Sequence, residues 1–324
     1  MIISRTPFRV SFVGGGTDLP AFYMHEPGAV LSTTIDKYVY ITVNRRFDDT
    51  LRLSYSKTEI VDRFDCVQHP LFRETMRFTG VTSGVEVTSV ADVPAGTGLG
   101  SSSSFTVGLL HALHAYQNRY KPAAELAKEA CHIEIDVLGD PIGKQDQYAA
   151  AFGGLRIYEF NGDGKVFVTP VICSAETKQE LFGQLMLFYL GGTRDAKQVL
   201  AEQSNNTADK IACLRAMRDS VERFRSILVR GTRLNEIGEL LHEAWMAKKQ
   251  LASSISNGRI DEIYERACKA GALGGKLLGA GAAGFLLLFC ERQKQNAVRT
   301  CLRELREIPF AHEAEGSKII YVGS

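Results

Sequence analysis

The 324-residue chain is 45% hydrophobic and 23% charged, which is enough apolar material for a sizeable core and about two domains. Its 38 Lys and Arg residues balance 37 Asp and Glu residues, so charge favours neither a nucleic acid nor an anionic membrane as partner. The longest apolar stretch, residues 280–290, is too short to span a bilayer, and the first residues show no basic leader with a long apolar core. These features predict a cytoplasmic protein.

The seven cysteines are scattered along the chain, are odd in number and form no Cys-x-x-Cys pair. This usage is typical of reduced, mostly buried thiols in a reducing compartment. We therefore expect neither a disulfide framework nor a structural zinc site.

The first part of the chain is rich in predicted strands. Short β-branched and aromatic runs separated by turn residues predict strands over residues 8–13, 29–35, 39–44, 51–55 and 85–90. After Pro94, apolar residues recur at helical spacing, which predicts helices over residues 101–120 and 122–138. We expect a mainly antiparallel sheet followed by two helices.

A hairpin over residues 155–170 is predicted from its Asn161-Gly162-Asp163-Gly164 turn. We place the domain boundary just after it, so that residues 1–174 and residues 175–324 form two domains. The second domain is predicted to contain strands over 185–190, 284–290 and 318–322, and helices within 196–254, over 260–270 and over 293–307. The predicted fold class is α+β with two domains.

The segment Pro94-Ala95-Gly96-Thr97-Gly98-Leu99-Gly100-Ser101-Ser102-Ser103-Ser104 lies between a predicted strand and a predicted helix. Its glycines allow the backbone to approach a polyphosphate, and free amides at the helix start favour an anion. It lacks the Gly-Lys-Ser/Thr of a Walker loop and the parallel βαβ context of a dinucleotide site. An ordinary glycine-serine turn with a serine helix cap is the alternative interpretation.

Residues 94–102 match the phosphate-loop pattern Pro-x-Gly-x-Gly-Leu-Gly-Ser-Ser, and residues 6–18 and 276–285 are similar to two further motifs of the same family. The sequence thus resembles the GHMP kinases, named after galactokinase, homoserine kinase, mevalonate kinase and phosphomevalonate kinase. The resemblance implies ATP and Mg²⁺ as cofactors. It also implies an amino-terminal domain like domain 2 of ribosomal protein S5 and a ferredoxin-like carboxy-terminal domain.

The resemblance assigns roles to individual residues. The ATP phosphates would be bound by Pro94, Gly96, Gly98, Leu99, Gly100, Ser101, Ser102, Ser103 and Ser104. Asp146 would be the base, because Gln145-Asp146-Gln147 is similar to a catalytic Met-Asp-Gln segment, and Arg9 would stabilise its carboxylate and the acceptor oxyanion. Ser102 and Glu134 would hold Mg²⁺, although the choice among Ser101, Ser102 and Ser103 stays open. Asp146 as a helix cap, Arg9 as a surface residue and Glu134 in an ion pair with Lys128 or Lys144 are the alternatives.

The sequence Gly14-Gly15-Gly16-Thr17-Asp18-Leu19 differs from the galactokinase and mevalonate kinase patterns. It resembles the subgroup of heptose 7-phosphate kinases and fucokinases, which implies that Gly16, Thr17 and Asp18 bind sugar hydroxyls. A phosphate on the sugar would need a second anion site, for which Lys144, Gly192, Thr193, Arg194 and Lys197 are the candidates.

The resulting hypothesis is transfer of the ATP γ-phosphoryl group to the anomeric hydroxyl of D-glycero-D-manno-heptose 7-phosphate. The product would be the 1,7-bisphosphate used for nucleotide-activated heptose, such as GDP-heptose, in surface polysaccharide synthesis. The alternatives are a kinase of an unphosphorylated sugar such as L-fucose and a catalytically silent sensor of sugar and ATP. Besides these small molecules, a homodimer is the one partner that we consider.

Overall fold

The structure is a computed structural model that describes residues 1–192, 196–207 and 209–323, without the side chains of residues 196–198. None of the helices in these described ranges has the length and hydropathy of a membrane span. All seven cysteines are free, but only Cys131 and Cys290 are buried, so the prediction of mostly buried thiols is wrong.

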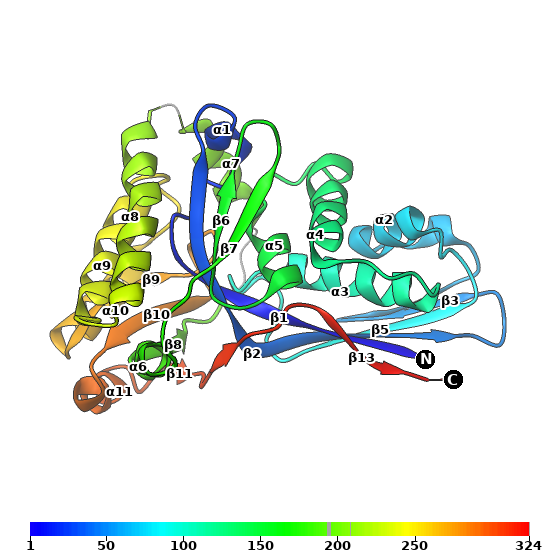
Figure 1. Cartoon of the computed structure of the whole chain (residues 1–324). Helices are drawn as coiled ribbons and strands as arrows, with labels where there is room; N and C mark the ends of the chain where they lie inside the picture. Colours follow the sequence, from blue (N-terminus) through cyan, green and yellow to red (C-terminus); the bar gives the residue numbers. More distant parts are fainter. Residues whose placement is uncertain (193–195, 208, 324) are drawn as a thin grey trace.

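A nine-stranded sheet combines seven strands from the first half of the chain with two strands from its carboxy-terminal end (Figure 1). Its strands are β1 (Ile2–Val13), β2 (Gly28–Arg45), β3 (Leu51–Ser54), β4 (Thr58–Val61), β5 (Val85–Ala91), β6 (Arg156–Phe160), β7 (Val166–Pro170), β12 (His312–Glu313) and β13 (Lys318–Val322). The main path is β13-β1-β2-β5-β3-β4, with β6 and β12 paired to β2, and β7 paired to β6. Among these described pairings only β3 with β5 is parallel, which confirms the mainly antiparallel prediction.

Strand β2 combines two predicted strands into one of 18 residues. Its partners on β1 change abruptly, since Pro7 lies opposite Tyr38 whereas Phe8 lies opposite Ile35. The polar pair at residues 36–37 is therefore accommodated in an irregularity of the ladder and does not end the strand. Two strands were predicted because this polar pair interrupts the apolar pattern.

Helices cover the sheet around the predicted phosphate loop. They are α1 (Pro20–Tyr23), α2 (Pro70–Thr79), α3 (Ser101–Tyr116), α4 (Ala123–Cys131), which continues as a π-helix over His132–Val137, and α5 (Gln145–Phe152). Helix α3 packs against β1 and β2, and α5 packs against α3 and α4. The predicted helix over residues 101–120 ends early because Asn118 has a left-handed backbone (φ 58°). This packing brings the start of α3 and the start of α5 together.

A second, four-stranded antiparallel sheet has the order β11-β8-β10-β9. Its strands are β8 (Leu185–Tyr189), β9 (Ala272–Leu277), β10 (Phe285–Cys290) and β11 (Arg306–Glu307), and the helices of this part are α6 (Ala175–Gly183), α7 (Ala196–Asn205), α8 (Ile211–Arg230), α9 (Asn235–Lys249), α10 (Gly258–Lys269) and α11 (Gln295–Cys301). Helices α8, α9 and α10 gather on one side of the molecule (Figure 1).

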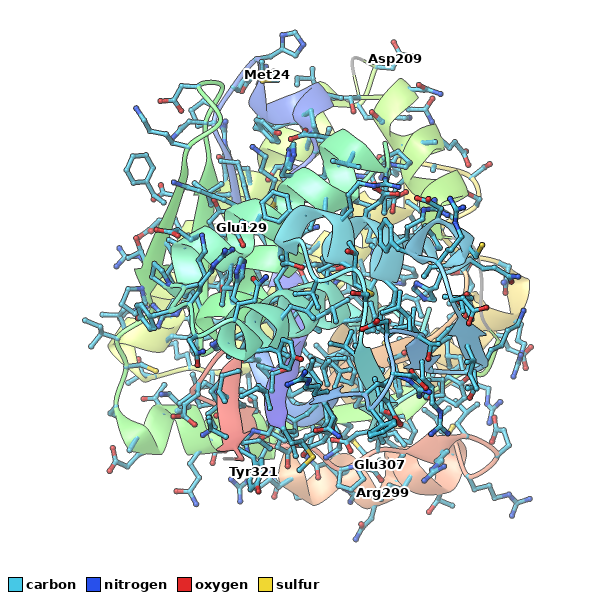
Figure 2. All side chains as sticks on the ribbon, turned by 90° about the vertical axis from the view of Figure 1, so that its right-hand side faces the viewer. Met24, Glu129, Asp209, Arg299, Glu307 and Tyr321 are labelled. Atoms are coloured by element: carbon cyan, nitrogen blue, oxygen red, sulfur yellow. The ribbon has the colours of Figure 1, made fainter. Side chains whose placement is uncertain are left out.

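The last predicted helix is too long, because residues 306–307 pair with β8 as a strand. Helix α11 ends at Cys301, and the chain returns to the sheet five residues later. A bidentate ion pair joins the two elements: Arg299 Nε and Nη2 lie 2.7 and 3.0 Å from the carboxylate oxygens of Glu307. Figure 2 shows these two side chains close together at one edge of the molecule.

The terminal strand β13 was predicted within the second domain, but it pairs with β1 in the first sheet. Ile2 lies opposite Val322, so the two ends of the described chain are neighbours (Figure 1). The chain thus leaves the first sheet after β7, builds the second sheet, and returns to the first sheet through β12 and β13. A division at residue 174 does not separate the two sheets completely.

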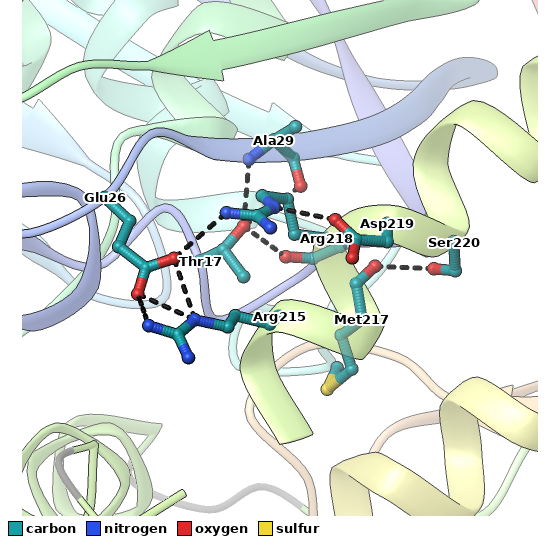
Figure 3. A network of polar contacts seen from close by, with 9 residues as sticks. Thr17, Glu26, Ala29, Arg215, Met217, Arg218, Asp219 and Ser220 are labelled. Atoms are coloured by element: carbon teal, nitrogen blue, oxygen red, sulfur yellow. Dashed lines mark hydrogen bonds and ion pairs between the residues drawn. The ribbon is translucent and has the colours of Figure 1, made fainter. Parts of the chain in front are cut away.

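Contacts with α8 join the amino-terminal segment to the second half of the chain (Figure 3). Glu26 accepts hydrogen bonds from Arg215 (2.8 Å from Nε) and from Arg218 (3.2 Å from Nη1). The rings of Phe12 and Phe224 stack with centroids 5.0 Å apart. These contacts hold β1 and the segment that follows it against α8.

Candidate active site

A cavity of about 300 Å³ lies where the ends of β1, the loop before α3, the start of α5 and the end of β9 meet. Ten residues singled out in the sequence line it: Arg9, Gly16, Asp18, Gly96, Gly98, Gly100, Ser101, Ser102, Ser103 and Asp146. They come from three separate segments of the chain, and the structure brings all three to one place.

The loop before α3 is built on left-handed glycines. Gly96, Gly98 and Gly100 have φ values of 74°, 87° and 75°, which residues with a Cβ adopt only at a cost. A Cβ on Gly98 would also lie 2.6 Å from the carbonyl oxygen of Leu278. The loop therefore packs directly on the glycine-rich segment after β9, while the amino end of the 16-residue helix α3 opens toward the cavity. This arrangement suits a bound polyphosphate.

Arg9 and Asp146 form a bidentate ion pair beside this loop. Arg9 Nε and Nη2 lie 2.7 and 2.8 Å from the two carboxylate oxygens of Asp146, and Arg9 Nη1 donates to the carbonyl oxygen of Gly98 at 2.6 Å. Arg9 is buried, whereas the Asp146 side chain keeps 28% of its surface exposed. A fixed guanidinium thus orients a carboxylate that still reaches the cavity. This geometry suits a group that accepts a proton.

Asp18 lines the same cavity, close to Asp146. Its carboxylate accepts hydrogen bonds from the backbone amides of Gly16 (2.9 Å) and Gln145 (3.4 Å). Burial and the nearby charge of Asp146 raise the pKa of Asp18. Gly143 is required here, because a Cβ would lie 1.9 Å from an Asp18 oxygen. The amides hold the carboxylate in place at the start of α5.

Glu134 lies behind the cavity wall and is fully buried. Its carboxylate accepts hydrogen bonds from Ser103 and Thr106, each at 2.7 Å, and from Gln147. Burial raises the pKa of Glu134 to about 7, although these three hydrogen bonds act in the opposite direction. Ser103 and Ser102 both line the cavity, so Glu134 is one side chain away from it.

Some predicted site residues make internal contacts. The Thr17 hydroxyl forms hydrogen bonds with the carbonyl oxygens of Gly14 and Ala29 and with the Ala29 amide. The Ser104 hydroxyl donates to the Pro7 carbonyl oxygen. Leu99 is fully buried in the core, and the carbonyl oxygen of the exposed Pro94 accepts a hydrogen bond from Thr97. These contacts shape the two loops, and direct ligand contacts of these residues stay a prediction.

The predicted phosphate clamp is only partly within the described structure. Lys144 turns outward, with its Nζ 3.3 Å from the Gly164 carbonyl oxygen and 5.1 Å from the centre of the Tyr23 ring. Gly192 is exposed and has a φ of 76°. Thr193, Arg194 and the Lys197 side chain lie outside the described residues. The clamp stays a prediction.

Several cavity residues had not been assigned a role from the sequence. They include Ser11, Gln145, Gln203, Lys248 and Lys276. Gln145 and Lys276 could have been found from the sequence, because Gln145 immediately precedes Asp146 and Lys276 is the first residue of the carboxy-terminal motif. Lys248 could not, because it lies inside an ordinary helical pattern. Gln145 is 4% exposed; its Oε1 accepts from Ser11 at 3.1 Å and its Nε2 has no partner. A buried amide donor thus stays unpaired in a residue that lines the cavity.

Comparison with known proteins identifies the family of the chain. The models of the GHMP kinase N-terminal domain and of the GHMP kinase C-terminal domain match residues 65–154 and 221–308. The chain belongs to the GHMP kinase family and has its two-domain fold. It is 30% identical to the D-glycero-alpha-D-manno-heptose 7-phosphate kinase of Campylobacter jejuni, over 98% of each chain.

A second relative and two solved structures share less sequence with this chain. The chain is 25% identical to the bifunctional fucokinase/GDP-fucose pyrophosphorylase of Arabidopsis thaliana, over 93% of this chain and 31% of that protein. Among solved structures, a D-glycero-D-manno-heptose 1-phosphate kinase from Bacteriodes thetaiotaomicron superposes with a TM-score of 0.84 at 24% identity, covering both chains fully. A putative sugar kinase from Campylobacter jejuni gives a TM-score of 0.78 at 26% identity, over 98% of this chain and 97% of that one. The fold of these structures matches throughout the described chain.

Proposed function

We propose that this GHMP kinase transfers the γ-phosphoryl group of ATP to the anomeric hydroxyl of D-glycero-D-manno-heptose 7-phosphate. The observation that carries the proposal is the bidentate pair of Arg9 and Asp146 beside the glycine loop. The cavity thus combines the glycine loop, which can bind phosphates, with the oriented carboxylate of Asp146. The choice of acceptor is supported by the relative that is 30% identical over nearly all of both chains.

In this reaction Asp146 accepts the proton of the attacking hydroxyl. The acceptor oxygen forms a bond to the γ-phosphorus, the bond between that phosphorus and its bridging oxygen breaks, and ADP leaves with the bridging oxygen. Phosphoryl transfer depends mainly on positioning and charge stabilisation. Arg9 fixes the direction of the Asp146 carboxylate, and Asp18 and Gln145 offer hydrogen-bonding partners for sugar hydroxyls.

Magnesium would be held mainly by the nucleotide. Mg²⁺ keeps several waters and uses only one or two carboxylates besides the phosphates. Within the described residues no group of three or more His, Cys, Asp or Glu side chains forms a ready metal site. The cavity-lining Ser102 hydroxyl and the Glu134 carboxylate, with one of its four lone-pair directions still free of a donor, fit this modest demand. The ion would neutralise charge on the phosphates, and Ser102 and Glu134 would position it.

The experiment is an assay of the purified protein with Mg-ATP and a sugar panel of heptose 7-phosphate, mannose, L-fucose and galactose. ADP release measures turnover, and phosphorus NMR identifies the product. Preferential formation of a 1,7-bisphosphate supports the proposal. Turnover of a free sugar alone would favour the second candidate, a kinase of a sugar such as L-fucose, whose support is the similarity to fucokinases.

A catalytically silent sensor of sugar and ATP is the remaining alternative. It would bind both ligands and release no ADP with any acceptor. The oriented Asp146 argues against it, because a binding protein needs no carboxylate held by a buried arginine. A homodimer also stays a prediction, which the mass of the protein in solution would test.

A further inference from the structure

Two lysines of the second domain lie in the cavity wall. Lys248 comes from α9 and Lys276 from β9, and they are 7% and 3% exposed. Lys276 Nζ donates to the Phe12 carbonyl oxygen at 3.0 Å, and Lys248 Nζ donates to the carbonyl oxygens of Leu277 (3.2 Å) and Gly279. An ammonium has three donors, so both lysines keep at least one for a ligand.

Neither lysine has a carboxylate partner in the part of the chain that the structure describes. The ion pairs of the described chain are formed by other residues. The negative charge of Asp18 acts to raise the pKa of both lysines, but within the described structure it forms no ion pair with either. Burial, followed by the charge of Arg9, lowers the pKa of Lys248 to about 7, and burial and the charge of Lys248 lower that of Lys276. A buried ammonium is costly unless an anion accompanies it. A neutral side-chain donor could bind the carbonyl oxygens of Phe12, Leu277 and Gly279 without the cost of burying a charge, so a structural role alone does not require lysine.

We propose that Lys248 and Lys276 form an anion subsite that binds the oxygens of a phosphoryl group. This inference rests on the proposed function and names the part of the site that recognises phosphate on the side of the second domain. The phosphoryl group is either the one that the acceptor already carries or the one that is being transferred. In both cases the ligand supplies the counter-charge that the two lysines lack.

The location of the lysines favours this role over a purely structural one. Gly279, whose carbonyl oxygen binds Lys248, packs against Gly98 of the phosphate loop, since a Cβ on Gly279 would lie 2.4 Å from the Gly98 Cα. Lys276 reaches across to β1, the strand that carries Arg9. The subsite therefore faces the glycine loop from the other domain. Lys144, which the sequence predicted to bind the phosphate of the sugar, instead points away from the cavity and donates to the Gly164 carbonyl oxygen.

The test uses Lys248→Met and Lys276→Met, which keep a similar length and remove the charge. The matched control is Lys249→Met, the next residue on α9, whose Nζ pairs with Asp261 at 3.1 Å and which does not line the cavity. Steady-state kinetics are measured with heptose 7-phosphate and with the same heptose without its phosphate. Thermal unfolding verifies that each variant is folded. If Lys276→Met does not fold, Lys276→Gln replaces it, because Gln keeps a donor for the Phe12 carbonyl oxygen.

Loss of a charge-assisted hydrogen bond is expected to change a kinetic constant by about 10- to 100-fold. If the acceptor's phosphate is the ligand, KM rises by this factor for heptose 7-phosphate and not for the free heptose. If the transferred group is the ligand, kcat falls by this factor with both acceptors. Folded variants whose constants stay within about twofold of the wild type, as for Lys249→Met, would overturn the subsite.

A separate measurement distinguishes failure of the subsite from failure of the proposed function. Wild-type protein that does not phosphorylate heptose 7-phosphate would refute the acceptor. The lysines are then tested by calorimetric titration with inorganic phosphate. The subsite predicts binding to the wild type that weakens by about tenfold or more in the double Met variant. Equal binding to both proteins, or no binding to the wild type, would overturn it.

Discussion

Arg9 and Asp146 lie 137 positions apart in the sequence and share two hydrogen bonds of 2.7 and 2.8 Å at the start of α3. Strand β1 supplies the arginine and the first turn of α5 supplies the aspartate. Gly100 lies directly against the pair, since a Cβ there would make tight contacts of 3.2 Å with Arg9 Cγ and 3.3 Å with an Asp146 oxygen. The pair links the phosphate loop to the proposed base.

Asp146→Asn should lower kcat by about 100- to 10,000-fold, because an amide cannot accept the acceptor's proton. Binding of ATP should change little, since the side-chain hydrogen bonds of Asp146 in the described structure go to Arg9 and not to the loop amides. Turnover is measured by ADP release and nucleotide binding by titration with a non-hydrolysable analogue. Asp163→Asn, in the exposed turn between β6 and β7, is the control. Retention of wild-type turnover by Asp146→Asn would exclude Asp146 as the base.

Arg9→Lys tests whether the fork geometry of the guanidinium matters. Lysine keeps the charge and cannot bind both Asp146 oxygens and the Gly98 carbonyl oxygen together. We expect kcat to fall by about tenfold or more while KM for the acceptor changes less. Arg5→Lys is a matched control on the same strand, where Arg5 pairs with Glu313 outside the cavity. Equal effects of the two substitutions would contradict a positioning role for Arg9.

The local parts of the fold could be predicted from the sequence. The β6–β7 hairpin follows from its turn residues, and the phosphate loop follows from three glycines before a helix. Strand β9 was missed, because Gly274 and Gly275 have a low preference for strands. Both glycines are required by packing: a Cβ would lie 2.0 Å from the Gly238 carbonyl oxygen and 2.2 Å from that of Leu287, respectively. Residues 272–277 therefore form a strand because of their tertiary contacts with α9 and β10, and not because of their own strand preference.

The candidate site was predictable where it depends on short motifs and not where it depends on tertiary packing. Asp146 and Arg9 belong to motifs, and the structure brings them together. Lys248 reaches the cavity only because α9 packs on β9, and its sequence neighbourhood resembles any amphipathic helix. Outside the motifs, no local pattern tells a buried lysine from a partly exposed one such as Lys249. The contribution of α9 to the site was therefore missed.

Gln145→Met tests the buried amide that precedes Asp146. Its Nε2 has no partner in the described structure, and Met would fill a similar volume without a donor. We expect KM for the sugar to rise by about 5- to 10-fold, the effect of one neutral hydrogen bond, with KM for ATP unchanged. The measurement is steady-state kinetics with each substrate varied in turn. An unchanged sugar KM would show that Gln145 only supports Ser11.

Lys248 should make the stability of the ligand-free protein depend on pH. Its pKa is about 7 in the folded protein and 10.5 ordinarily, so between these values the unfolded chain binds more protons. Stability therefore rises with pH across this window, and the cost of burying Lys248 is largest below pH 7. Arg9, Asp18 and Lys276 face Lys248, and Arg9 and Lys276 oppose its charge.

Lys248→Met should accordingly favour the folded state most at pH 6, because lowering the lysine pKa costs about 1.4 kcal/mol for each pH unit. This cost exceeds the loss of the hydrogen bonds to the Leu277 and Gly279 carbonyl oxygens. The gain should shrink toward pH 10. Urea unfolding of wild type, Lys248→Met and Lys249→Met at pH 6, 8 and 10 measures it. A difference between wild type and Lys248→Met that does not vary with pH would contradict the burial of a titrating ammonium.

Gly98→Ala tests the contact between the phosphate loop and the second domain. The new Cβ would lie 2.6 Å from the Leu278 carbonyl oxygen, at a residue with a φ of 87°. Gly80→Ala is matched to it, because Gly80 ends α2 with a φ of 77° and a Cβ there would have no neighbouring atom within 4 Å. Both variants share a left-handed backbone cost of about 1 kcal/mol, and only Gly98→Ala adds a collision. We expect both to lower Tm, and only Gly98→Ala to raise KM for ATP, by about tenfold or more. If both variants raise KM for ATP equally, general loss of stability explains the effect, and the close packing of Gly98 on Leu278 has no part in nucleotide binding.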